Sequence, residues 1–294
     1  MTVAATNITA AVGKQLNTII LDRVAGGRLV LPVLPEVATK CLTALKETDF
    51  HQQRLVSQLE ADPLLAALVI RTANTAAHGA SVRGLDQAVG RLGQGRMKTL
   101  MVEYMAHEVF RSTDPRIEAA AKKVWRHSLA VAHLARDLAA FTGAGDAAAG
   151  EAAYLGGLLH DIGKPVLAAM LLDVERHTTA KSPTAARMDE RDWVDTIEAL
   201  HRNIGVAIAT KWKLADDVTA AIRDCSDFDN SDRKGVANIV RFANALAKRE
   251  GYTTGPIDAA DIDALVMVGR SLLGADDALL KRLTGSLAER LAGA

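Results

Sequence analysis

Apolar positions recur along most of the chain at intervals of three and four residues, which is the spacing of one face of an α-helix. Runs of β-branched residues, which would indicate strands, are few, and alanine and leucine dominate. Glycines and Asp-Pro pairs separate the periodic segments. The pattern therefore predicts an all-α chain.

The first hundred residues divide into short predicted helices. An amphipathic arm over 7–25 ends at Gly26-Gly27, and a helix is expected to open at Pro35. Asp62-Pro63 is a helix start, with an aspartate cap followed by proline, and a further helix over 85–92 should close at Gly93. This region is thus predicted to consist of helices with tight connections.

An apolar segment, Glu151–Leu159, is predicted to form a central buried helix. Gly156 and Gly157 would allow a neighbouring helix to approach closely. Because the residue before a proline is disfavoured in the helical region, Lys164 is expected in a break, with Pro165 opening the next helix. The apolar helix should therefore end just before this break.

His160 and Asp161 stand side by side at the end of that segment. Neighbouring side chains on a helix point about 100° apart, so the pair can share an ion only if other elements supply further ligands. The alternative is a histidine and an aspartate that cap a buried helix end. The pair by itself leaves both interpretations open.

Composition narrows the class of protein. The 35 basic and 35 acidic residues give zero formal charge, so no nucleic-acid partner is expected. The segment 63–77 is also a poor recognition helix for a helix-turn-helix, because Arg71 and Asn74 are its only side chains suited to contact DNA. Cys41 and Cys225 stand in no metal-ligand spacing, which fits a reducing compartment. No signal peptide and no run of about 18 apolar residues is visible, so a soluble cytoplasmic protein without a membrane partner is predicted.

A series of short motifs resembles the HDOD family, relatives of the HD-domain phosphohydrolases. In order, these are Leu31-Pro-Val-Leu-Pro35, Glu60-Ala-Asp-Pro63, Arg71-Thr-Ala-Asn74, His78-Gly79, Gln87-Ala-Val-Gly-Arg-Leu-Gly93, Val124-Trp-Arg-His-Ser128, Gly156-Gly-Leu-Leu-His-Asp-Ile-Gly163 and His201-Arg-Asn-Ile-Gly205 with Trp212. The resemblance implies an all-α fold in which an N-terminal helical lobe packs on an HD-like bundle.

The corresponding domain prediction has three parts. An arm over 1–26 precedes an HDOD domain over 27–225, which consists of a lobe over 27–112 and a bundle over 113–225. A helical extension over 226–294 includes the late HD-type helix, and its last two helices are expected either to cover the core or to pair with a second copy in a homodimer.

The resemblance also implies a metal site made from distant positions. His127 fills the first ligand position, His160 and Asp161 the second and third, and Asn244 stands where the enzymes carry aspartate. An amide is a neutral donor and binds a divalent ion less well than a carboxylate. Without an ion, Asn244 is expected to link His127 to Asp161 through hydrogen bonds. The site is therefore predicted to be degenerate, with no cofactor or, alternatively, a weakly bound divalent metal.

Two further residues are candidates for contact with a ligand. Lys164 matches a lysine that contacts phosphate in some phosphodiesterases, although a solvated lysine at a helix end is the alternative. His201 is the only further histidine available between the His-Asp pair and Asn244 at a family position, so a multinuclear centre is not expected. Catalytic residues are not assigned.

Two functions remain in competition. The favoured one is a non-catalytic bacterial signalling module that acts through protein–protein contact, with a nucleotide-like ligand in the degenerate cleft. The alternative is a metal-dependent phosphohydrolase or phosphodiesterase acting on nucleotides or cyclic dinucleotides. Asn244 is the residue that distinguishes them.

Overall fold

The computed structural model describes residues 35–47, 49–75, 81–143, 147–181 and 189–292, together with positions 18 and 22. All of the regular structure in these ranges is helical, as predicted. The chain divides into two compact units, one containing Val33–Val109 and the other Phe110–Ala294. The predicted arm over 7–25, apart from positions 18 and 22, and the motif His78-Gly79 lie outside these described residues.

The Val33–Val109 unit is a small helical cluster in which α5 packs against each of the other helices. Its core is formed by leucines, valines and methionines such as Leu55, Leu65 and Met101, which are fully buried. The helices are α2 (Glu36–Ala44), α3 (Gln52–Leu59), α4 (Pro63–Thr75) and α5 (Leu85–Val109).

Two predicted features of this unit are present. The Oδ1 atom of Asp62 accepts hydrogen bonds from the backbone N–H groups of Leu64 and Leu65, both at 3.1 Å, so the Asp-Pro pair starts α4. Gly93 has φ of +70° and kinks α5 at the position where the helix predicted over 85–92 was expected to close.

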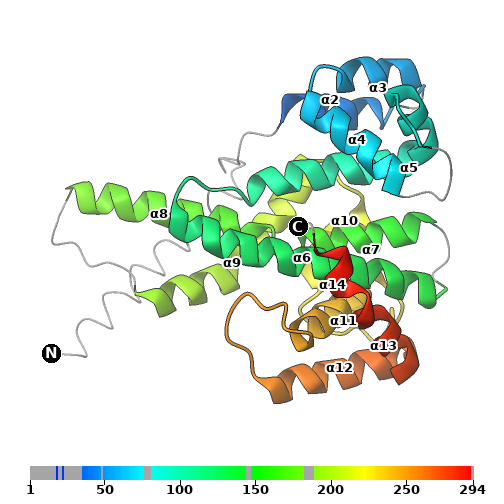
Figure 1. Cartoon of the computed structure of the whole chain (residues 1–294). Helices are drawn as coiled ribbons and strands as arrows, with labels where there is room; N and C mark the ends of the chain where they lie inside the picture. The colour runs from blue at the N-terminus through cyan, green and yellow to red at the C-terminus, as the bar shows by residue number, and fades with distance from the viewer. Residues whose placement is uncertain are drawn as a thin grey trace, which may run out of the picture. The chain divides into compact units, whose positions relative to one another are not determined.

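The Phe110–Ala294 unit is a larger bundle (Figure 1). Its α7 packs against α6, α10 and α11, and α6 also packs against α11. The helices are α6 (Pro115–Phe141), α7 (Ala147–Leu159), α8 (Gly163–Lys181), α9 (Glu190–Lys211), α10 (Asp216–Asp224), α11 (Val236–Arg249), α12 (Ala259–Leu273), α13 (Asp277–Gly285) and α14 (Leu287–Arg290). The predicted extension over 226–294 thus shares a compact unit with the predicted bundle.

Glycines set the spacing around α7. A Cβ atom on Gly157 would lie 2.8 Å from the Cα atom of Ala132, so α6 and α7 touch backbone to backbone. A Cβ on Gly156 would lie 2.9 Å from the Cβ of Ala221 in α10. Figure 1 shows α6 and α7 running side by side. The close approach expected at these two glycines is present, and it places α6 against the end of α7.

The helix break after α7 differs from the predicted one. α8 begins at Gly163 rather than at Pro165, so Lys164 lies inside its first turn. Proline is tolerated there because the first N–H groups of a helix have no acceptor within the helix. The break therefore falls on His160, Asp161 and Ile162, which form a turn.

The segment Ala148–His177 is long and apolar enough to cross a membrane by composition, but 72% of its apolar window is buried inside the bundle. Residues 152–161 are buried except Leu155, which is half-buried. This burial is typical of a core segment.

Candidate metal and ligand site

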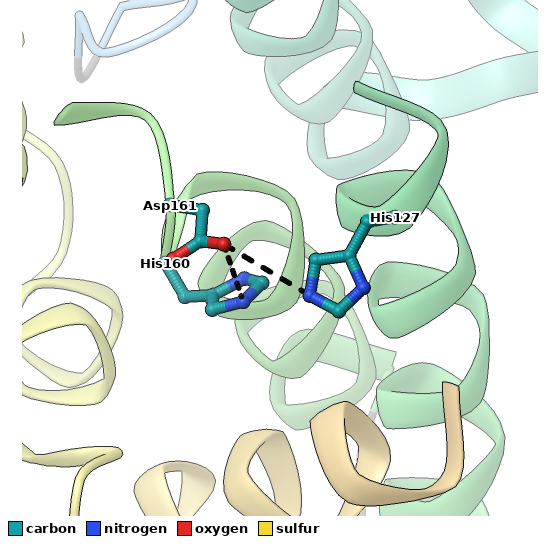
Figure 2. A group of neighbouring side chains, drawn as sticks. All are labelled: His127, His160 and Asp161. Carbon is teal, nitrogen blue, oxygen red and sulfur yellow. Dashed lines mark ion pairs between the residues drawn. The ribbon is translucent and has the colours of Figure 1, made fainter. Parts of the chain in front are cut away.

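The turn after α7 brings its two polar residues to a histidine from α6. His127 lies on α6, whereas His160 and Asp161 follow α7, and Figure 2 shows the three side chains pointing toward one another. Their ligand atoms all lie within 4.8 Å of one another, and all three side chains are buried. We call His127, His160 and Asp161 the HD cluster.

The hydrogen bond that His127 makes determines which of its ring nitrogens is left without a proton. Its Nδ1 atom lies 2.8 Å from the backbone carbonyl oxygen of Tyr252, an acceptor, so this nitrogen carries the proton. Its Nε2 atom is buried, has no hydrogen-bond partner and lies 3.9 Å from Oδ2 of Asp161. The bare lone pair therefore faces the carboxylate.

His160 is held in the same way. Its Nδ1 atom lies 2.7 Å from the carbonyl oxygen of Gly157, while Nε2 has no partner and lies 3.6 Å from Oδ2 of Asp161. Burial lowers the pKa of His160 to about 3 and also lowers the pKa of His127, so both imidazoles are neutral at neutral pH. Neutral imidazoles with Nδ1–H on a carbonyl are the form that binds metal through Nε2.

Asp161 is the only anion of the HD cluster. Burial raises its pKa, whereas His160, Lys164 and the hydrogen bond from His201 lower it, and the net pKa lies well below the usual value. Lys164 Nζ lies 3.1 Å from Oδ2 and His201 Nε2 lies 3.3 Å from Oδ1. Because His160 is neutral, the Lys164 ammonium is the cation that balances this carboxylate.

Lys164 also reaches Glu198 on α9, with Nζ 2.7 Å from Oε1. The Lys164 side chain is only 11% exposed, and its pKa is raised because the two carboxylates outweigh the effect of burial. The lysine is therefore a buried bridge between Asp161 and Glu198, rather than a solvated side chain at a helix end.

His201 reaches Asp161 because α8 and α9 meet at a glycine. A Cβ atom on Gly163 would overlap the carbonyl oxygen of His201. The Nδ1 atom of His201 lies 3.0 Å from the carbonyl oxygens of both Ile197 and Glu198. His201 is thus a buried support of the Asp161 carboxylate.

Asn244 lies on α11, which packs against both α6 and α7. Its Oδ1 atom is buried and has no hydrogen-bond partner, so it does not make the link between His127 and Asp161 that was expected. An unpaired buried amide oxygen costs about 1–3 kcal/mol. Like the Nε2 atoms of His127 and His160, it is a buried polar atom without a hydrogen-bond partner.

Three contributors to this site were not predicted. Glu198 precedes His201 by three residues and Lys248 follows Asn244 by four, so helical spacing from the predicted residues would have indicated both. Burial lowers the pKa of Lys248, which lies within electrostatic range of Asp161. Tyr252 acts through its backbone carbonyl, for which no side-chain pattern exists.

The residues present fit one divalent ion of modest affinity. Two imidazole nitrogens and one carboxylate are close enough to hold an ion, and Asn244, at the fourth ligand position that the family resemblance implies, has an unpaired Oδ1. Nitrogen and oxygen donors of this kind suit zinc, iron or manganese. The ion would have to displace Lys164 from Asp161, which lowers its affinity.

Comparison with known proteins agrees with this all-helical fold. The HDOD domain family model matches residues 31–228. The chain belongs to the HDOD family.

Individual relatives are more distant. An uncharacterized protein of Treponema pallidum (strain Nichols) is 28% identical over 220 residues, which are 73% of this chain and 41% of that protein. A Shewanella amazonensis SB2B protein proposed to be a metal-dependent phosphohydrolase has 21% identity and a TM-score of 0.70, over 95% of this chain and 99% of that chain.

Two further solved structures share the fold. An HDOD domain protein of unknown function from Geobacter sulfurreducens has 20% identity and a TM-score of 0.59, over 90% and 92% of the two chains. A protein of Marinobacter aquaeolei VT8 proposed to act in signal transduction has 24% identity and a TM-score of 0.56, over 89% of this chain and 58% of that chain.

Proposed function

We propose that this protein is a non-catalytic HDOD signalling module of the bacterial cytoplasm, which acts through contact with a signalling protein. The observation that supports it is the charge balance of the HD cluster. Asp161 is the single carboxylate of the cluster, and the Lys164 ammonium already lies 3.1 Å from the oxygen that faces both histidines. A divalent ion would gain little attraction from a carboxylate that is already neutralised.

The cluster instead serves to order the junction of α6, α7, α8 and α9. His127 joins α6 to the loop after α11, and Asp161 joins the turn after α7 to His201 of α9. A buried polar network of this kind specifies one arrangement of the helices. The partner would recognise that arrangement, and a nucleotide-like ligand near Lys164 would alter it.

The Marinobacter relative, proposed to act in signal transduction, supports the same function for this chain. The two cysteines, Cys41 and Cys225, are buried and free, as expected in a reducing cytoplasm.

The test is a metal and turnover measurement on the purified protein. After dialysis against chelator and reloading with zinc, manganese or ferrous iron, we expect well under one ion per chain and no hydrolysis of a phosphodiester beyond that of Asp161→Asn. Retention of about one ion per chain, with hydrolysis that is lost in His160→Asn, would overturn the proposal.

A second function is favoured by the unpaired ligand atoms: a metal-dependent phosphohydrolase, as proposed for the Shewanella protein. Nε2 of His127, Nε2 of His160 and Oδ1 of Asn244 are all buried without a partner. A bound divalent ion would supply Lewis acidity at a phosphoryl oxygen. The chain itself would contribute Lys164 to hold a substrate phosphate and His201 to orient Asp161.

A further inference from the structure

A cavity lies between His127 and the loop that joins α11 to α12. Its volume is about 580 Å³, within the range of roughly 300–1,000 Å³ that is usual for small-molecule sites. It is lined by Lys123, Arg126, His127 and the loop residues Glu250–Pro256. His160, Asp161 and Lys164 do not line it, so His127 is the one residue that the cavity shares with the HD cluster.

The helical wall of this cavity is basic. Lys123 and Arg126 lie one turn apart on α6 and line the same cavity, and both are exposed. Neither makes an ion pair with an acid in the described part of the chain. Glu250 is the acidic residue of the lining, and its Oε1 atom lies 3.9 Å from Nε of Arg249, which lies outside the cavity. The net charge available to a ligand is therefore positive.

The loop wall supplies neutral donors. Thr253 and Thr254, which both carry hydroxyl groups, line the cavity. No backbone carbonyl in the described ranges accepts a hydrogen bond from the N–H groups of Thr254 or Gly255. Hydroxyls, free amides and a pair of cations are the groups that recognise a phosphate.

The same loop is tied to the HD cluster. The Tyr252 N–H donates to the carbonyl oxygen of Ala247, which fixes the start of the loop on α11. The Tyr252 carbonyl then accepts from Nδ1 of His127 at 2.8 Å. Any ligand that moves this loop will alter the hydrogen bond that holds His127.

We propose that this cavity is a binding site for a small phosphate-bearing anion, and that its occupancy is transmitted to His127 through the Tyr252 carbonyl. The anion pairs with Lys123 and Arg126 and accepts hydrogen bonds from the Thr253–Gly255 loop. Anion binding at this cavity does not require a metal in the HD cluster, and it gives a signalling module an input that is coupled to the cluster through His127.

The binding test uses pyrophosphate and AMP as probes, titrated by calorimetry in a low-salt buffer with chelator. We expect at least one probe to bind, with Lys123→Gln and Arg126→Gln each weakening binding roughly tenfold, because each removes one charge-assisted contact. Lys122→Gln is the matched control: Lys122 is exposed on the same turn but pairs with Glu118 and does not line the cavity. It should bind as the wild type does.

The transmission test uses the imidazole nitrogen resonances of His127, assigned by comparison with His127→Gln. Saturating probe should shift them in the wild type and in Lys122→Gln, but not in Lys123→Gln/Arg126→Gln at the same probe concentration. Thermal unfolding of each variant checks that the fold is kept.

Failure of both probes to bind would overturn the proposal, as would equal binding by the double variant and the control. Binding that is lost in His160→Asn but kept in Lys123→Gln/Arg126→Gln would place the anion in the HD cluster. That outcome contradicts this second site while leaving the proposed signalling function intact.

Discussion

Two asparagines on α11 lie in contrasting polar regions. Asn238 is buried and fully paired: its Oδ1 accepts from Asp229 N–H at 2.8 Å, and its Nδ2 donates to the carbonyls of Asp229 and Asp232 at 2.7 and 2.8 Å. Asn244, less than two turns later, leaves Oδ1 buried and unpaired. The two differ in what surrounds them rather than in their chemistry.

The difference between the two asparagines distinguishes a polar side chain that stabilises the fold from one that is available to a ligand. The side chain of Asn238 supplies hydrogen-bond partners to the backbone of the connection over 229–233, which has no regular secondary structure to supply them, so Asn238 stabilises the fold. Asn244 lies on α11, which packs against α6 and α7, and its Oδ1 is unpaired like the Nε2 atoms of His127 and His160; each such buried group is costly unless a ligand uses it. A substitution of the paired Asn238 should therefore mainly lower stability, whereas a substitution of the unpaired Asn244 should mainly change ligand binding.

The largest effect is expected for metal affinity in Asn244→Asp. A second carboxylate doubles the negative charge facing a divalent ion. A unit charge pair at about 4 Å is worth up to about 4 kcal/mol at an effective dielectric constant near 20, which corresponds to as much as a thousand-fold. Calorimetric titration with zinc or manganese measures the change.

Asn238→Asp is the control for that experiment, because it adds the same charge to the same helix at a side chain whose hydrogen bonds go to Asp229 and Asp232 rather than to the HD cluster. It should leave metal affinity unchanged. Equal tightening in both variants would show that net charge, rather than the position of Asn244, governs binding.

For stability, in contrast to metal affinity, we expect the larger change at Asn238 and the smaller one at Asn244. Asn238→Ala removes three hydrogen bonds between a buried side chain and the backbone of Asp229 and Asp232, and should lower the free energy of unfolding by about 3 kcal/mol. Asn244→Ala removes an oxygen that has no partner and should cost less than about 1 kcal/mol. Urea unfolding of the two variants compares them, and similar losses would contradict the distinction.

A smaller loss is expected where the site depends on close helix approach. Gly163→Ala would force a methyl group onto the His201 carbonyl oxygen and should cost about 2 kcal/mol through displacement of α9. Gly95→Ala is the matched substitution, in a helix with nothing within 4 Å of the added atom, and should stabilise by about 0.5–1 kcal/mol. Denaturant midpoints with equal shifts in the two variants would disprove the packing argument.

The smallest effect is a slope of stability against pH. Burial depresses the pKa of His160 to about 3, from 6.5 in the unfolded chain. Below pH 6.5 the unfolded chain therefore takes up a proton that the folded chain refuses, and the free energy of unfolding falls as the pH falls.

This histidine should contribute about 1.4 kcal/mol per pH unit between pH 6 and 4 in the presence of chelator. His160→Gln should flatten the slope by that amount. Unfolding curves at several pH values measure the slopes of the wild type and of the variant, and an unchanged slope in His160→Gln would refute the assignment of a buried neutral imidazole.

Much of the fold follows from patterns that span only a turn or two. The cap at Asp62, the kink at Gly93 and the helical period require only near neighbours, so the all-α class and the order of helices were predictable from the sequence. His127, His160 and Asp161 were also identified, through motifs, and the structure brings their ligand atoms within 4.8 Å of one another.

Tertiary structure decided the state of those residues. The proton on Nδ1 of His127 depends on a carbonyl 125 positions away, and the buried bridge made by Lys164 depends on Glu198, 34 positions away. Such contacts arise only when α6, α9 and the loop after α11 pack together. Backbone carbonyls also belong to every residue type, so no sequence pattern marks the one that will accept. The sequence by itself determined which ligands could meet, and packing determined which of their atoms are paired and which remain free to bind.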